Sequence, residues 1–560
     1  MAIGPLLVQR GVLTSDQLEA AAAEQRRTGE RLDRVLLRLG VASRADVLRA
    51  VGDQFHLPVV DLEGVEPDGA VLKLIPPKVV FRQRCVPLNK RGQTLIVATA
   101  DPYDLGVLDE LRLHTGCPIE LVLADEDSLA NFIRRHYGVG GDTLEAMAGQ
   151  EGRGPVVETK PDEADQAQEA SVIRLVSDLL SEAIEQRATD VHIEPYEREL
   201  VVRYRIDGVL ERANVPPTIS RFAMAIVSRL KIMASLNIAE KRLPQDGRIA
   251  FRHRPAGGGP TREYDLRLSI IPMLFGEGVV LRVLSKTAAL MSLDELGMPG
   301  NIQQRWERLI TRPHGILLVT GPTGSGKSTT LYASLNQIVS DAIKVITVED
   351  PVEYHVAGVN QIQMNSKVGL DFAAGLRSIL RHDPDVVMIG EIRDRETAEV
   401  AVQASLTGHL VFSTLHTNDA PGALTRLIDM GVEPFLVSSS LEGIMAQRLV
   451  RRVCAECAAP YAPAPAELPQ GFTLAPGELL RKGTGCRACR NTGLRGRVGV
   501  YELMSVGDEV RAMITNRASA PELAAASKRA GELFRLFDDG LAKVRVGLTT
   551  LEEVVSALAE

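Results

Sequence analysis

Apolar residues recur at helical spacing through the first 54 residues, and the pattern occurs twice. Leu7 and Gly11 of the first copy reappear as Leu36 and Gly40 of the second. Each copy predicts a helix, a glycine turn and a second helix. The residues before each second helix are spaced as N-cap and N3 positions, Thr14 with Gln17 and Ser43 with Asp46. We expect residues 1–57 to form two packed helical hairpins.

The hydrophobic pattern between this repeat and residue 290 mixes two periods. Residues 58–138 combine strand-like segments such as 94–98 with helical ones, which predicts a small α/β unit. Residues 139–169 are rich in glycine and acidic residues, so we expect a flexible linker there. An amphipathic helix follows, and the strands after it predict an α+β domain at 170–290.

From about residue 291, apolar strands alternate with loops and helices, which is typical of a parallel sheet in an α/β protein. The 560 residues are enough for about three or four domains, and the formal net charge of −8 disfavours a nucleic-acid motor. No apolar run reaches the roughly 18 residues of a membrane span, and the N-terminus lacks the features of a signal peptide. We therefore expect a cytoplasmic protein or one peripheral to a membrane.

The most informative stretch follows the apolar strand at 315–320. A buried strand that feeds a glycine-rich loop ending in Lys-Ser is typical of the phosphate-binding loop (P-loop) of nucleotide triphosphatases. The residues that we expect to bind the nucleotide are Gly321, Pro322, Thr323, Gly324, Ser325, Gly326, Lys327, Ser328 and Thr329. Lys327 would neutralise phosphate oxygens, and the Ser328 hydroxyl would be a ligand for Mg²⁺. ATP and Mg²⁺ are the expected cofactors.

Carboxylates follow the next two apolar strands. Glu349, Asp350 and Glu353 end the first, where acidic side chains can hold Mg²⁺ or its waters; a solvated acidic turn is the alternative. The strand at 385–389 delivers Glu391. A carboxylate beside the γ-phosphate can polarise an attacking water, so we expect Glu391 to be catalytic.

Histidines and cysteines supply two further groups of candidates. His409 and His416 flank an apolar strand that should neighbour the strand of Glu391, which makes them candidates for sensing the γ-phosphate rather than ordinary core or surface residues. Four of the six cysteines form two C-x-x-C pairs, Cys454 with Cys457 and Cys486 with Cys489. This spacing suits tetrahedral zinc, with a redox pair or unligated thiols as alternatives.

Together these motifs resemble those of the secretion ATPases, the family that powers type II secretion and type IV pili. The similarity covers about residues 170–560, and its motifs are the segments 319–330, 347–354, 383–397 and 407–418. Within the family, the sequence is more similar to the type II secretion branch than to the pilus-extension branch.

The resemblance implies an α/β fold with a RecA-like core at 291–560, which includes a zinc subdomain at 450–495 and C-terminal helices at 505–560. The domain at 170–290 would be the PAS-like N2 domain of the family, preceded by an N-terminal docking domain. Six copies would form a ring, with each nucleotide held between an N2 domain and a core.

The resemblance also assigns roles to residues. Lys327 and Ser328 belong to the Walker A motif, and Glu391 is the catalytic glutamate of an atypical Walker B motif. The Asp box and the His box comprise Glu349, Asp350, Glu353, His409 and His416. Arginines of the N2 domain reach the nucleotide in the family, where they stabilise the charge on the γ-phosphoryl group. The candidates here are Arg203 and Arg205, with Arg242, Arg248 and Arg282 as further ones.

By this resemblance the chain is an ATP-hydrolysing motor that drives pseudopilus assembly and protein export through a type II secretion system. Its expected partners are five further copies, an inner-membrane platform protein and a membrane-anchored recruiting subunit, and not nucleic acid. We expect it on the cytoplasmic face of the inner membrane. The alternatives are a type IV pilus-assembly ATPase and, in another class, a nucleotide- or cyclic-di-GMP-binding scaffold with little turnover.

The N-terminal repeat resembles a module that binds cyclic di-GMP in some relatives. The motif of that module begins Arg-Leu-Gly in each copy, whereas this chain has Ala2-Ile3-Gly4 and Arg31-Leu32-Asp33. Because each copy departs from the motif, we favour docking onto a membrane component over cyclic di-GMP binding.

Overall fold

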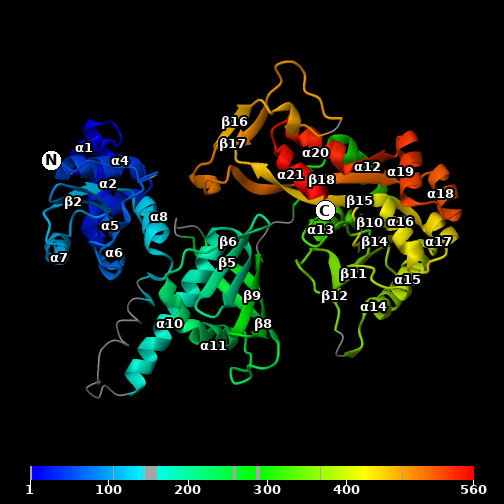
Figure 1. Ribbon diagram of the computed structural model, residues 1–560, viewed down its shortest axis with the longest axis horizontal. Helices are drawn as coiled ribbons and strands as arrows, with labels where there is room; N and C mark the ends of the chain where they lie inside the picture. Colours follow the sequence, from blue (N-terminus) through cyan, green and yellow to red (C-terminus); the bar gives the residue numbers. More distant parts are fainter. Residues whose placement is uncertain are drawn as a thin grey trace. The chain divides into compact units, whose positions relative to one another are not determined.

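The computed structural model describes residues 3–62, 64–104, 106–141, 143–144, 161–255, 260–285, 291–365, 368–469 and 471–559. Contacts within the chain define two compact units, Met1–Thr287 and Ala288–Glu560, and each is described by itself (Figure 1).

The first unit begins with the predicted helical repeat. Its helices are α1 (Ile3–Gln9), α2 (Ser15–Thr28), α3 (Leu32–Arg38) and α4 (Arg44–Phe55). The capping prediction is confirmed, because the hydroxyls of Thr14 and Ser43 accept hydrogen bonds from the backbone N–H groups of Gln17 and Asp46, each at 3.2 Å. Leu7 and Leu36 are fully buried in the core that the two hairpins share.

A small α/β part follows, as the mixed periodicity predicts. It contains a sheet in the order β1-β2-β3 and four helices. The elements are β1 (Cys85–Arg91), β2 (Thr94–Thr99), β3 (Ile119–Leu123), α5 (Gly69–Leu72), α6 (Pro77–Gln83), α7 (Gly106–Thr115) and α8 (Glu126–Tyr137).

The rest of the first unit is a six-stranded sheet in the order β6-β5-β4-β9-β8-β7. Its strands are β4 (Ala188–Pro195), β5 (Leu200–Ile206), β6 (Val209–Arg212), β7 (Gln245–His253), β8 (Arg262–Met273) and β9 (Gly276–Ser285). The helices α10 (Pro161–Glu185) and α11 (Ala223–Met233) pack on the apolar face of this sheet (Figure 1). Strand β5 alternates buried Val202 and Tyr204 with half-buried Arg203 and Arg205, so the other face is polar.

The predicted linker at 139–169 lies largely outside the described residues. The structure has helix α10 from Pro161, within the last part of this segment. Residues 161–169 contain Ala, Glu and Gln, which are good helix formers, so this acidic stretch supports a helix as well as a loop.

The second unit is built on an eight-stranded sheet in the order β12-β11-β13-β14-β10-β15-β18-β19. Its strands are β10 (Gly315–Thr320), β11 (Val345–Glu349), β12 (Val359–Gln363), β13 (Val386–Ile389), β14 (Leu410–Leu415), β15 (Leu441–Val453), β18 (Leu494–Ser505) and β19 (Leu533–Phe534). The first six are parallel and the last two antiparallel to their neighbours. β10, β13 and β14 are buried along their whole length, as expected for parallel strands covered on both faces.

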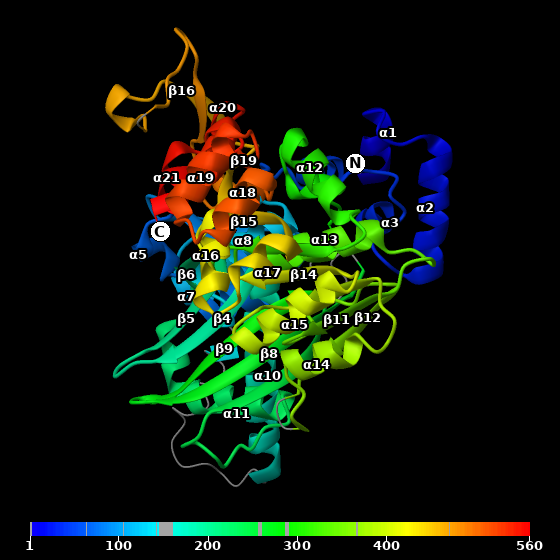
Figure 2. The same ribbon diagram turned by 90° about the vertical axis from the view of Figure 1, so that its right-hand side faces the viewer.

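Helices cover this sheet and connect its strands. They are α12 (Gly300–Ile310), α13 (Lys327–Ile338), α14 (Phe372–Ile379), α15 (Arg395–Leu406), α16 (Ala420–Asp429) and α17 (Pro434–Ser440). α14 and α15 lie side by side (Figure 2), with α14 next to the strands β11 and β13 and α15 next to β10 and β14. This alternation of strand and helix confirms the predicted α/β class.

The C-terminal part adds a cysteine-containing arm and four helices. The arm carries the short strands β16 (Ala458–Tyr461) and β17 (Leu480–Gly483), which project from the end of β15 (Figure 2). The helices are α18 (Asp508–Thr515), α19 (Ala520–Arg529), α20 (Leu536–Arg545) and α21 (Leu551–Ala559). Among the described residues, no helix is both long and apolar enough to cross a membrane.

Candidate nucleotide site and cysteine cluster

The P-loop leaves the carboxyl end of β10 and enters α13. Gly324 and Gly326 have φ angles of 82° and 89°, which side chains other than glycine rarely adopt. A Cβ atom on Gly321 would lie 2.5 Å from the backbone oxygen of Gln447, and one on Gly326 would lie 2.8 Å from the amide nitrogen of its side chain. The loop therefore requires glycine for conformation at Gly324 and Gly326, and for space at Gly321 and Gly326. Pro322, Thr323 and Ser328 are exposed.

Lys327 is held at the mouth of this loop. Its Nζ donates hydrogen bonds to the backbone oxygens of Gly321 at 2.8 Å and Pro322 at 3.0 Å. Burial lowers the pKa of Lys327 to about 8; the positive charge of Arg448 acts in the same direction and the negative charge of Glu391 opposes it. The ammonium is thus a poorly solvated cation beside a carboxylate, ready for an anionic ligand.

Glu391 follows β13, so it lies at the same edge of the sheet as the P-loop. Its carboxylate accepts hydrogen bonds from Arg393 and from His416, whose Nε2 lies 3.2 Å from Oε2. Burial acts to raise the pKa of Glu391, but Arg393 and His416 outweigh it and hold that pKa below its usual value. Glu391 is therefore an ionised, partly desolvated carboxylate that could accept a hydrogen bond from water.

The two predicted histidines lie at opposite ends of β14. His416 follows the strand and reaches Glu391, whereas His409 precedes it and bonds the backbone oxygen of Ala404 at 2.9 Å. A six-residue strand spans about 20 Å. The structure thus brings His416, but not His409, to the P-loop edge of its own subunit.

The three predicted acidic residues, Glu349, Asp350 and Glu353, also lie in different surroundings. Glu349 is only 4% exposed and accepts hydrogen bonds from three side chains, those of Tyr332, Thr347 and Gln361. Burial, followed by the charge of Glu349, raises the pKa of Tyr332 well above its usual range, so this phenol remains a donor. Glu349 is built into the core beneath the loop that follows β11.

The other two carboxylates of this group lie in that loop. The backbone N–H of Glu353 donates a hydrogen bond to the hydroxyl of Tyr332 at 3.2 Å. Asp350 is exposed, and its charge acts on Arg393. Of the three predicted acidic residues, Asp350 is the one that the structure links to the surroundings of Glu391.

The polar face of the six-stranded sheet carries a row of basic residues. Asp190 of β4 pairs with Arg205 of β5 on one side and with Arg282 of β9 on the other, and the row continues to Arg267 of β8 and Arg248 of β7. Like charges directly opposite each other destabilise a sheet, and a bound anion would offset the repulsion within this row. Arg203 pairs instead with Glu194.

Arg267 is the member of this row that sequence reasoning missed. The alternation of β8 places Arg267 between buried Leu266 and Leu268, which is the signal that could have found it. Its alignment with Arg282 became visible only in the strand register. Arg242, in contrast, is exposed outside the sheet and pairs with Glu240.

The four cysteines of the arm converge on one point. The Sγ atoms all lie within 4.8 Å of one another, with Cys454 and Cys486 at 3.7 Å and Cys457 and Cys489 at 3.8 Å. Zn–S bonds of about 2.3 Å in a tetrahedron place sulfur atoms about 3.8 Å apart. A disulfide would need about 2.05 Å, so the donor set fits a tetrahedral metal ion.

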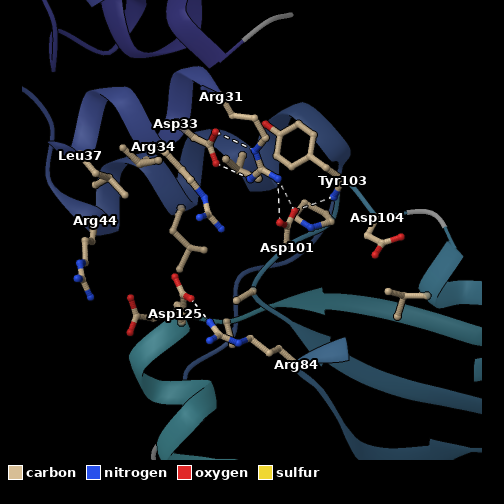
Figure 3. Close-up of a pocket in the computed structure, with 18 of the residues that line it drawn as sticks. Arg31, Asp33, Arg34, Leu37, Arg44, Arg84, Asp101, Tyr103, Asp104 and Asp125 are labelled. Atoms are coloured by element: carbon tan, nitrogen blue, oxygen red, sulfur yellow. Dashed lines mark hydrogen bonds and ion pairs between the residues drawn. The ribbon is translucent and has the colours of Figure 1, made fainter. Parts of the chain in front are cut away.

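A cavity of about 860 Å³ lies between the helical repeat and the small α/β part (Figure 3). The guanidinium of Arg31 forms two hydrogen bonds of 2.8 Å with Asp101 and lies 3.9 Å from the ring centroid of Tyr103. It also bonds Asp33. This arginine of the second repeat copy is therefore engaged by two carboxylates and a ring within the chain.

A P-loop that joins a buried strand to a helix, with a carboxylate at the end of a parallel strand, defines a nucleotide triphosphatase of the RecA-like class. The family model described as "Type II/IV secretion system protein" matches residues 165–556, and that of the MshEN domain matches 55–143. The chain belongs to the type II/IV secretion system protein family and is an ATP-hydrolysing enzyme, with ATP and Mg²⁺ as its cofactors.

Individual relatives agree with this assignment. The chain is 51% identical to a "Type II secretion system protein E" of Pseudomonas aeruginosa over 83% of this chain and 92% of that protein. It is 43% identical to the "Type IV pilus assembly ATPase PilB" of Myxococcus xanthus over 100% of this chain and 99% of that protein. The solved Yersinia pseudotuberculosis ATPase DotB, 19% identical with a TM-score of 0.50, shares the fold over 73% of this chain and 96% of its own.

Proposed function

We propose that this protein is the ATPase motor of a type II secretion system. The observation that carries the proposal is the grouping of Lys327, Glu391 and His416 at one edge of a parallel sheet, in a chain about half identical to type II secretion system proteins E. The energy of ATP hydrolysis would drive pseudopilus assembly at the cytoplasmic face of the inner membrane.

The residues divide the chemistry between them. The P-loop N–H groups and Lys327 bind the phosphates, and the Ser328 hydroxyl holds Mg²⁺, which neutralises phosphate charge when bound. Glu391 orients and polarises the attacking water, while Arg393 and His416 keep its carboxylate ionised. Asp350 and Glu353 would bind waters of the metal, and Glu349 shapes their loop from within the core. We keep Thr329 as a candidate of the P-loop and His409 as a candidate of the His box, although His409 lies at the far end of β14 from His416.

The arginine row would supply the cations that stabilise charge on the γ-phosphoryl group. Arg205, Arg267 and Arg282 are the candidates that the strand register favours; Arg203, which bonds Glu194, is a weaker one. Arg267→Ala should lower the ATPase rate at least tenfold. Arg252→Ala is the matched control, because Arg252 is exposed on the same sheet and pairs only locally with Glu263.

The cysteine cluster would hold a structural Zn²⁺, which ties the two ends of the arm together. We further propose a hexameric ring whose N-terminal part, residues 1–138, docks onto a membrane-anchored recruiting subunit, while the motor acts on an inner-membrane platform protein. The alternative ligand for the N-terminal cavity is cyclic di-GMP. Titration of the protein with cyclic di-GMP in a calorimeter separates the two, because docking predicts no heat of binding.

The specific observation that favours a type IV pilus-assembly ATPase is the 43% identity to such a protein over the whole chain. The test is Glu391→Gln at the chromosomal locus of the source organism, with ATPase assays of the purified variant. A secretion motor predicts that a set of enzymes disappears from the medium and stays in the periplasm. Loss of surface pili with an unchanged medium would favour the pilus motor. An unchanged ATPase rate would reject the role of Glu391 and favour a scaffold.

A further inference from the structure

Strand β15 brings two polar residues, Gln447 and Arg448, next to the P-loop. β10 and β15 are parallel and pair up to Thr320 and Ala446, so the next residues of β15 run alongside the loop. Gln447 is 1% exposed, and its Oε1 accepts a hydrogen bond of 2.7 Å from the hydroxyl of Thr330 in α13. The middle of β15 is therefore packed against both the loop and its helix.

The side chain of Arg448, the next residue of β15, contacts the turn that follows β14. It is only 7% exposed, and its Nη2 donates to the backbone oxygen of Asn418 at 3.2 Å and to its Oδ1 at 3.1 Å. Nη1 donates to the backbone oxygen of Gln447 at 3.2 Å. Burying a guanidinium is costly unless it is hydrogen-bonded, so these bonds favour one geometry of the turn.

The turn at Asn418 carries two contacts of the nucleotide site. Thr417 accepts a hydrogen bond at its backbone oxygen from the hydroxyl of Thr320, the last residue before the P-loop, at 2.8 Å. His416 bonds Glu391. Arg448 is thus linked by hydrogen bonds to Asn418, Asn418 by the backbone to His416, and His416 by a hydrogen bond to Glu391, the carboxylate that we assign to water activation.

We propose that Arg448 is a positioning residue for ATP hydrolysis: its clamp on the Asn418 turn holds His416 against Glu391. Arg448 touches no reacting atom in this role, and the inference rests on the proposed function of Glu391. Its guanidinium is also close enough to Lys327 for its charge to act on that ammonium, which places the clamp beside the phosphate site.

The test compares kcat and the dissociation constant for ATP in variants of the full chain. We expect Arg448→Met and Asn418→Ala to lower kcat about tenfold or more with ATP binding changed less than about twofold, because a small misplacement of a catalytic group is costly. Arg448→Lys should recover only part of the loss, since one ammonium cannot replace the planar fork. Arg452→Met is the control, because Arg452 is exposed on the same strand.

A double-mutant cycle identifies the route. If Arg448 acts through His416, the variant Arg448→Met/His416→Ala has the same kcat as His416→Ala alone. The clamp would be overturned if the two substitutions lowered kcat by independent factors that multiply in the double variant. It would also be overturned if Arg448→Met left kcat unchanged, with or without weaker ATP binding. If the Arg448→Met variant does not fold, the Asn418→Ala variant provides the test instead, because Asn418 is exposed. If the Glu391→Gln variant still hydrolyses ATP, the proposed role of Glu391 is rejected. If Glu391→Gln is inactive but Asn418→Ala has the kcat of the wild type, only the clamp is rejected.

Discussion

Lys327 shows how burial tunes a single binding group. With its pKa lowered to about 8, the free protein loses this positive charge above that pH, and ATP binding must then restore the proton. We expect the dissociation constant of a non-hydrolysable ATP analogue to be constant below about pH 8 and to rise up to tenfold per pH unit above it. Measurements from pH 7 to 9.5 test this. Lys327→Arg should give a flat profile, and a flat wild-type profile would contradict the prediction.

Glu349 is a residue whose position was predicted from the sequence but whose surroundings were not. Its partners Tyr332 and Gln361 belong to other elements, α13 and β12, so the packing of these elements against β11 brings the three side chains together. Replacing Glu349 by Ala leaves several buried donors unpaired. We expect a loss of about 2–4 kcal/mol in the free energy of unfolding of the second unit.

The single tryptophan, Trp306, is fully buried in that unit, so its fluorescence during urea unfolding reports this loss. Asp350→Ala is the control, because Asp350 is an exposed neighbour. Equal stabilities of the two variants would show that the buried network contributes nothing.

At the scale of elements, the cysteine arm and the C-terminal helices stabilise each other. Arg545 of α20 donates a hydrogen bond of 2.7 Å to the backbone oxygen of Thr473 in the arm. At the end of β15, from which the arm projects, Arg451 donates to Glu553 of α21. Phe472 packs in one apolar cluster with Val544 and Val554. Losing the metal should therefore loosen the helices as well as the arm.

We expect a chelator, or Cys454→Ser, to raise amide hydrogen exchange in β16, β17, α20 and α21 at least tenfold, because local opening becomes easier. Exchange in α14 and α15, on the far part of the sheet, serves as the internal control. Restoring Zn²⁺ should reverse the chelator effect but not that of the mutation. Protection that is unaffected by the chelator would reject a structural metal.

Elements with a strong local signal were predictable. The period of the helical repeat, its caps, the buried parallel strands and the P-loop all lie within short windows, where sequence determines local conformation. The arginine row, in contrast, depends on which strands pair and in which register. These are long-range relations, and a linear motif does not contain them.

At the scale of the whole molecule, the proposed hexamer gives a test in solution. ATP should promote assembly, and Glu391→Gln should trap the assembled form because it binds without turnover. Sedimentation of this variant with ATP and Mg²⁺ should show a species of six times 60.7 kDa. Lys327→Ala should remain smaller under the same conditions. A monomer at micromolar concentration with bound ATP would contradict the ring.

Strand β15 also has a mechanical consequence. Its 13 residues run from the amino edge of the sheet, past the P-loop at Gln447, to Val453, which directly precedes Cys454. The eight residues from Gln447 to Cys454 extend over about 23 Å, because each of the seven steps between them is about 3.3 Å. β15 pairs with β18 along this stretch as far as Val453, with a register shift between Arg451 and Val453. A tilt of a few degrees at the loop would displace the cysteine cluster by about an ångström or more. The cysteine cluster follows the far end of this strand, so a movement of the nucleotide site would displace the cluster more than the residues nearer the loop.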